Sequence, residues 1–285
     1  MRLQCFGTKA TKSLLQSRYG DTSEGAPRIL SASSLLASGI LTALAIFAFS
    51  ALNDAGIFNL AGSATCLSTN CFCEQPRLGK FGFVQPSNTF SSFFFVVIGV
   101  FLGHALLRDT RVWIAQLWPM PLIALSVGLC SAVFHATLTF IGQFLDVFAM
   151  HALAFFVIAK SARRSQILSP SVLVFAYAVA LSIAALLLFY LPETRRYLFA
   201  CLILLGIGAE RWTVKRYGIQ ISAKHLWIGI ACIAAGYVVW LLDNKLIICA
   251  PHSALQGHGV WHLAGAVSIA FLYRYYRSEQ TSATK

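Results

Sequence analysis

The sequence has few charged residues. Only 11% of its 285 residues are Asp, Glu, Lys or Arg, and 58% are hydrophobic, whereas a soluble domain usually carries about 25% charged residues. This deficit excludes an ordinary soluble domain and indicates a polytopic membrane protein built as one helical bundle. Acidic residues are scarcest, with 10 Asp and Glu against 22 Lys and Arg.

The resulting positive charge, formally +12 at pH 7, does not indicate nucleic-acid binding. The basic residues lie in short segments between apolar runs, so the chain has no solvated basic face that could follow a phosphate backbone. Internal repeats and low-complexity segments are also absent from the sequence. We therefore assign the basic residues to the topology of a membrane protein.

The apolar runs predict the fold, because each is long enough to cross a bilayer. They cover approximately residues 33–52, 88–107, 114–138, 143–160, 171–191, 196–210, 225–243 and 256–273. The predicted fold class is all-α, a polytopic transmembrane helix bundle. A long basic tail at 1–32 precedes the first run, so we interpret that run as a retained anchor helix, with a cleaved signal peptide as the alternative.

The distribution of Lys and Arg predicts the orientation. The N-terminal tail, the segments after spans two, four and six, and the C-terminal tail carry 17 of these residues, and the opposite loops carry five. By the positive-inside rule, both termini are expected in the cytoplasm. A bacterial inner membrane and an ER or Golgi membrane fit this topology equally well.

Ionisable side chains inside the apolar runs are the candidates for function, because they are costly in a membrane. His258 and His262 are four residues apart, so they share one face of a helix. Ser131 and His135 have the same spacing. The predicted topology places these residues and Asp146 at the non-cytoplasmic ends of their spans. Three histidines from two helices can bind zinc and leave a fourth position open to water.

Each of these residues also has a plainer interpretation. A satisfied internal hydrogen bond is the ordinary role of a single histidine, and we assign it to His104 and His151. Asp146 is a general base or a partner of a metal ligand, or else an acid favoured by the macrodipole at a helix N-terminus. Ser131 donates to a developing oxyanion, or else it is a small residue that lets helices pack closely.

Four cysteines lie on the predicted non-cytoplasmic side: Cys66, Cys71, Cys73 and Cys249. Thiols on that side can form disulfides in a periplasm or in an ER or Golgi lumen. A second zinc site is the alternative, but the C-x4-C-x-C run lacks the usual C-x2-C pairing.

At these residues the chain resembles the alkaline ceramidase family, the zinc amidase branch of a membrane hydrolase superfamily. That superfamily also includes adiponectin-receptor-like and GPI-remodelling proteins. The matching segments are CEQP at 73–76, NTFSS at 88–92, SAVFHATLTFIGQFLD at 131–146, LLDNKLIIC at 241–249 and QGHGVWH at 256–262. The resemblance covers about residues 70–276 and implies a seven-helix hydrolase core, with the first span as an addition.

The resemblance also implies the roles of individual residues. The implied zinc ligands are His135, His258 and His262. The implied groups at the reacting centre are Ser131 and Asp146. A disulfide between Cys73 and Cys249 is implied as well. The implied reaction is hydrolysis of the N-acyl bond of a ceramide-like membrane lipid, which yields a sphingoid base and a fatty acid.

Animal members of that family carry a calcium site around the C-E motif, and this chain departs from it. The chain keeps Glu74. Other positions of the pattern differ: Cys71 replaces aspartate, Pro76 replaces asparagine and Gln85 replaces glutamate. Because calcium needs about six to eight oxygen ligands, Glu74 offers at most a weak calcium site, and the sequence argues against calcium regulation.

The expected organisation is a cytoplasmic tail at 1–32, an extra anchor at 33–52, a ceramidase-like membrane domain at 53–276 and a second cytoplasmic tail at 277–285. The sequence makes no prediction of an oligomeric state. Two other functions stay open. One is a related lipid hydrolase that cleaves another amide or an ester. The other is a seven-helix receptor with structural zinc, in which a fourth protein ligand closes the site.

Overall fold

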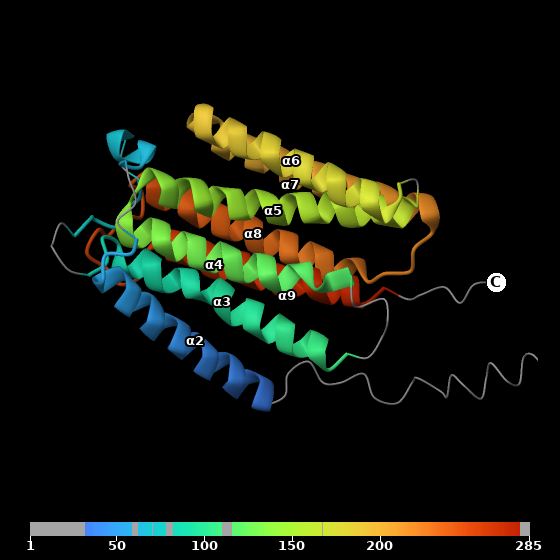
Figure 1. Cartoon of the computed structure of the whole chain (residues 1–285), viewed down its shortest axis with the longest axis horizontal. Coiled ribbons are helices and arrows are strands. Elements are labelled where there is room, and N and C mark those ends of the chain that lie inside the picture. The colour runs from blue at the N-terminus through green and yellow to red at the C-terminus, as the bar shows by residue number, and fades with distance from the viewer. Residues whose placement is uncertain are drawn as a thin grey trace, which may run out of the picture.

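The chain folds into a bundle of long helices that run along one axis (Figure 1). The computed structural model describes residues 32–58, 62–69, 71–77, 82–109, 116–166 and 168–279, so most of the two predicted tails lies outside the described residues. The long helices in these ranges are α2 Ala32–Asp54, α3 Pro86–Leu107, α4 Pro119–Thr137, α5 Phe140–Ser165, α6 Pro170–Tyr190, α7 Arg195–Tyr217, α8 Ala223–Asn244 and α9 Gly257–Arg277. Two short 3-10 helices, η1 Thr65–Thr69 and η3 Pro192–Thr194, complete the described elements.

The predicted all-α membrane bundle is confirmed. Among the described residues, seven helices are long and apolar enough to cross a membrane, namely α2 to α8, with η3 continuing into α7. The predicted eighth span, α9, has 21 residues but is not among these seven helices. Helix α9 carries two histidines and two arginines, and it packs against α8 and α3 in the bundle.

Proline residues mark the beginnings of several spans. Helices α3, α4 and α6 begin at Pro86, Pro119 and Pro170. A proline is tolerated in the first turn because the N–H that it lacks would have no partner inside the helix. These prolines therefore fix where the spans begin without weakening them.

The link between α4 and α5 is only two residues long. Leu138 has a φ of 47° and ends α4 in the left-handed conformation, and the Thr139 hydroxyl accepts a hydrogen bond from Gly142 N–H at 3.1 Å. Helix α5 thus begins at Phe140, earlier than the predicted boundary near 143, because Thr139 caps it. This tight link brings the C-terminal turn of α4 beside the first turns of α5.

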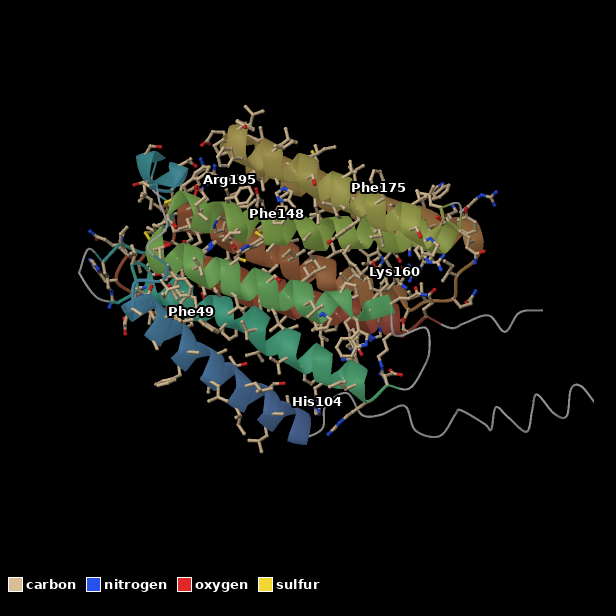
Figure 2. All side chains as sticks on the ribbon, viewed as in Figure 1. Phe49, His104, Phe148, Lys160, Phe175 and Arg195 are labelled. Carbon is tan, nitrogen blue, oxygen red and sulfur yellow. A yellow bond between two sulfur atoms is a disulfide. The ribbon has the colours of Figure 1, made fainter. Side chains whose placement is uncertain are left out.

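Small residues let the helices of the bundle approach closely. A Cβ atom on Gly128 of α4 would lie 2.8 Å from Val96 Cγ2 of α3, and one on Gly236 of α8 would lie 2.5 Å from Ala264 Cβ of α9. Helices in a membrane associate through such close packing. By contrast, α2 and α6 lie at the edges of the bundle (Figure 1), and α6 exposes large apolar side chains such as Phe175 (Figure 2).

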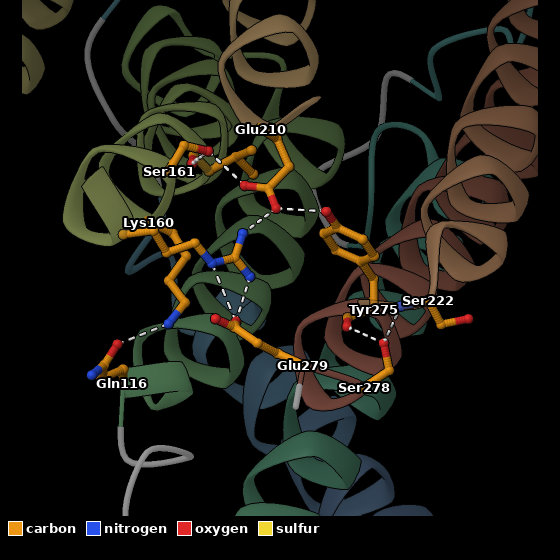
Figure 3. Close-up of polar contacts among 10 residues, drawn as sticks. Gln116, Lys160, Ser161, Glu210, Ser222, Tyr275, Ser278 and Glu279 are labelled. Atoms are coloured by element: carbon orange, nitrogen blue, oxygen red, sulfur yellow. Dashed lines mark hydrogen bonds and ion pairs between the residues drawn. The ribbon is translucent and has the colours of Figure 1, made fainter. Parts of the chain in front are cut away.

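One end of the bundle holds a buried polar network (Figure 3). Glu210 of α7 is fully buried, and it accepts hydrogen bonds from Ser161, Arg164 and Tyr275. Arg164 also pairs with Glu279. This network ties together the C-terminal ends of α5, α7 and α9.

Helix α2 begins and α9 ends at this same end of the bundle (Figure 1). Lys160 lies toward this end, whereas Arg195 lies at the opposite end, near η1 (Figure 2). The two ends of the described chain thus lie at the same end of the bundle.

Candidate metal centre and cavity

Three histidines meet at the end of the bundle opposite the Glu210 network. His135 lies in the last turn of α4, and His258 and His262 lie in the first two turns of α9. Ligand nitrogens of the three rings lie within 4.8 Å of one another, and His135 Nε2 is 3.0 Å from His258 Nε2. All three side chains are buried. The pairs predicted from spacing are therefore brought together in space.

A hydrogen bond outside the group orients the His135 ring. His135 Nδ1 lies 2.9 Å from Gln85 Oε1, while Gln85 Nε2 donates to the backbone carbonyl of Glu74 at 2.9 Å. Because the amide oxygen only accepts, His135 carries its proton on Nδ1 and leaves Nε2 free to bind a metal. Gln85 was not assigned this role from the sequence.

The other two rings are held in different ways. His262 Nδ1 lies 2.8 Å from the hydroxyl oxygen of Ser91 on α3. The His258 ring packs at a tilt of 38° on Phe72, with ring centroids 4.1 Å apart, and its Nδ1 has no hydrogen-bond partner among the described residues. Asp243 of α8 holds the start of α9, since its carboxylate accepts from Gly257 N–H at 3.0 Å.

Ser131 and Asp146 complete the group that the sequence predicts. Ser131 Oγ is 3.3 Å from His262 Nε2, and the Ser131 side chain also lies close to the Asp146 carboxylate. Both residues are buried. A hydroxyl, a carboxylate and three imidazoles thus share one buried volume, and His151, which bonds to the Val147 carbonyl at 2.7 Å, stays outside it.

This donor set fits a divalent transition metal. Imidazole nitrogens with a nearby carboxylate suit ions such as Zn²⁺, whereas Ca²⁺ and Mg²⁺ prefer oxygen ligands. Two of the three imidazoles also have the outer hydrogen bonds that metal-binding histidines usually make. The group can therefore hold a metal ion.

A cavity of about 570 Å³ opens from this group into the bundle. Ser131, Asp146, His258 and His262 line it at one end, and Glu210 lines it at the other. Between these ends its walls are mainly apolar and come from α5, α7, α8 and α9, including Met150, Leu153, Val157, Ile203, Ile230 and Ile269. Its size and apolar lining suit a small lipid-like ligand.

The cysteines at this end are paired in disulfides. Cys73 is bonded to Cys249, and Cys66 is bonded to Cys71. The first bond ties the loop before α3 to the connection between α8 and α9. Because disulfide sulfurs are not thiolate ligands, the alternative of a second zinc site on these cysteines is wrong.

Glu74, the predicted weak calcium ligand, holds the N-terminus of α3. Its two carboxylate oxygens accept hydrogen bonds from the backbone N–H groups of Ser87, at 2.7 Å, and Asn88, at 2.8 Å. Burial raises the pKa of Glu74, while these two hydrogen bonds act in the opposite direction. The carboxylate therefore serves as a helix cap, as a negative charge near the positive end of a helix dipole should.

Together the fold and the site define a class: multi-pass membrane enzymes whose polar centre is buried at one end of an apolar cavity. The ceramidase family profile matches residues 66–284. The chain is 26% identical to alkaline ceramidase of Drosophila melanogaster over 230 residues. This alignment covers 73% of the chain and 77% of that protein. The chain belongs to the ceramidase family, and it is a membrane hydrolase that acts on an amide bond.

Proposed function

We propose that this protein is a zinc-dependent amidase that hydrolyses the N-acyl bond of ceramide-like lipids to a sphingoid base and a fatty acid. The observation that carries the proposal is the meeting of three buried histidines with Ser131 and Asp146 at the end of an apolar cavity. His135, His258 and His262 hold the zinc ion in this proposal. When bound there, Zn²⁺ activates water near neutral pH and polarises the amide carbonyl.

Asp146 acts as the general base and then as the acid. Its carboxylate lines the cavity and has no salt-bridge partner in the described part of the chain, so it is free to accept a proton from the attacking water. It then passes this proton to the nitrogen of the leaving sphingoid base. Ser131 lies on the adjacent helix, where its hydroxyl can donate to the oxyanion of the tetrahedral intermediate.

The cavity accounts for a lipid substrate. In this proposal its apolar walls bury the hydrocarbon chains, and its polar end, which Asp146 and Ser131 line, receives the amide bond. Helix α7 packs on α5, and α8 packs on α9, without an extensive contact between α7 and α8. A lipid can therefore reach the cavity sideways from the bilayer, between α7 and α8.

We also propose that the site faces the non-cytoplasmic side and that both termini are cytoplasmic. Most Lys and Arg residues belong to the opposite end of the bundle, which the positive-inside rule assigns to the cytoplasm. The two disulfides lie at the site end, where an oxidising compartment supports them. In this arrangement α2 is an added anchor outside the hydrolase core, since it packs on α3 and precedes the family match.

The proposal is tested on detergent-purified protein by its zinc content and by fatty-acid release from ceramides, ester lipids and other N-acyl lipids. The expected result is about one zinc ion per chain, with amide cleavage that a chelator abolishes and zinc restores. Turnover that persists in both His258→Ala and Asp146→Ala would contradict the mechanism. Zinc without turnover of any lipid would favour a receptor with structural zinc, and cleavage of esters alone would favour another lipid hydrolase.

A further inference from the structure

Two arginines line the cavity at the end that holds the histidines. Arg195 and Arg196 begin α7, and both belong to the lining that Asp146, His258 and His262 also form. Arg196 lies close enough to His258 to interact with it electrostatically. A ceramide-like lipid with a plain hydroxyl head group is neutral, so its binding does not explain two guanidinium groups here.

Arg195 is only weakly neutralised by the protein. Its acidic partner is Glu193 at 3.4 Å, whose side chain is 80% exposed, and such exposed pairs contribute little. The other contacts of its guanidinium are neutral oxygens, Thr65 Oγ1 at 3.2 Å and Pro192 O at 2.7 Å. The charge of Arg195 therefore stays available to a ligand.

Arg196 has no carboxylate partner in the described ranges. Its guanidinium carbon lies 5.2 Å from the ring centroid of Trp240, which is a cation–π contact that holds the charge in place. Trp240 packs in turn against Tyr237 and Trp261, at centroid distances of 5.4 and 6.5 Å. The guanidinium is thus held against a cluster of rings, and its hydrogen-bond donors have no partner among the described residues.

Trp240 adds a further donor without a partner. Its Nε1 is buried and makes no hydrogen bond with the described residues, and its side chain also lines the cavity. A buried indole N–H usually finds an acceptor. This end of the cavity therefore combines two positive charges with an unused N–H donor.

We propose that Arg195, Arg196 and Trp240 form a binding site for the anionic group of a lipid, either a carboxylate or a phosphate. Guanidinium groups pair with both anions through two parallel hydrogen bonds. Such an anion has two sources if the proposed function holds: the carboxylate of the released fatty acid, and a phosphate head group on an N-acyl lipid substrate. The anion site itself is testable without hydrolysis.

The first test measures the binding of three lipid probes to zinc-loaded protein in a neutral detergent. The probes are palmitate, hexadecyl phosphate and hexadecanol, which have carbon chains of the same length and differ in the head group. We expect the two anions to bind about tenfold more tightly than hexadecanol, as charged hydrogen bonds predict. The double variant Arg195→Gln, Arg196→Gln should lose most of this preference and keep its affinity for hexadecanol. The matched control is Arg216→Gln, an exposed arginine at the other end of α7, which should change neither.

A second variant guards against a folding defect. Replacing both arginines by lysine retains the charge, so it should restore part of the preference for anions, which a purely structural role would not predict. Equal binding of the three probes to wild type, or an unchanged preference in the double Gln variant, would overturn the anion site. The arginines would then serve only as anchors at the membrane surface.

Hydrolysis assays identify the source of the anion. If the site holds the released fatty acid, palmitate should inhibit the wild type about tenfold more strongly than the double Gln variant. If it holds a head group, the variant should raise KM for a phosphorylated N-acyl lipid more than KM for the unphosphorylated lipid. If the wild type prefers the anionic probes but hydrolyses none of these lipids, the result would count against the amidase proposal and not against the anion site.

Discussion

Replacing Gln85 tests whether the start of α3 controls the metal centre. Gln85 is fully buried, and it accepts from His135 Nδ1 at 2.9 Å while donating to the Glu74 carbonyl at 2.9 Å. Gln85→Met keeps the approximate shape of the side chain but removes both polar atoms. The Nδ1–H of His135 is then left without an acceptor, and the proton can move to Nε2, where it would block metal binding.

The expected loss follows from these contacts. Removing the outer partner of a metal-binding histidine weakens metal affinity by about 10–100-fold, which corresponds to roughly 1.4–2.7 kcal/mol. This agrees with the cost of about 1–3 kcal/mol for leaving a buried donor unsatisfied. Gln85→Glu keeps an acceptor for His135 and should stay within about threefold of wild type, because a charged acceptor is stronger.

The assay is competition for Zn²⁺ between the purified protein and a chromogenic chelator, with thermal unfolding recorded in parallel. The matched control is Gln143→Met, which removes another buried glutamine that bonds to Thr65 and not to a histidine. It should lower stability and leave zinc affinity unchanged. Wild-type zinc affinity in Gln85→Met would refute the positioning role, and equal losses in both variants would show a general effect of destabilisation.

Three further predictions concern single residues. Asp146→Asn should retain zinc and lower kcat by about 10²–10⁴-fold, measured by metal content and fatty-acid release. Burial raises the pKa of Glu74, so the folded state binds this proton more tightly than the unfolded state. The resulting stability is present at acid pH and lost as pH rises through the folded pKa, and Glu74→Gln should remove this part of the pH dependence of thermal unfolding. Gly236→Ala should lower the free energy of unfolding by about 1–3 kcal/mol, because its Cβ would overlap α9, whereas Gly208→Ala, which meets no atom within 4 Å, should not.

Some residues of the site were predictable because their signal is local. His258 and His262 share a helix face through their four-residue spacing, and Ser131 precedes His135 by the same interval. Asp146 follows soon after a short link, so it had to lie near the end of α4. Each of these inferences needs only the helical period and the place where a span ends.

Other residues could not be predicted, because their roles depend on contacts between distant segments. Gln85 and His135 are 50 residues apart, and Ser91 and His262 are 171 residues apart. Ser91 stood in a segment matching the family, but nothing in its sequence context indicates a histidine partner. From the sequence, Arg195 and Arg196 were interpreted as loop charges that set the topology. In the structure they begin α7 and line the cavity.

The sequence by itself determined the membrane class, the spans α2 to α8 and the histidine pairs, because hydropathy and helical period are properties of neighbouring residues. Helix α9 shows the limit of such reasoning, since it was predicted as a span but is not among the seven described helices that are long and apolar enough to cross a membrane. Only the tertiary structure decided which nitrogen each histidine presents, what Glu74 caps and where the cavity runs. Those features arise where α3, α4, α7 and α9 pack against one another, and packing depends on all of these surfaces at once.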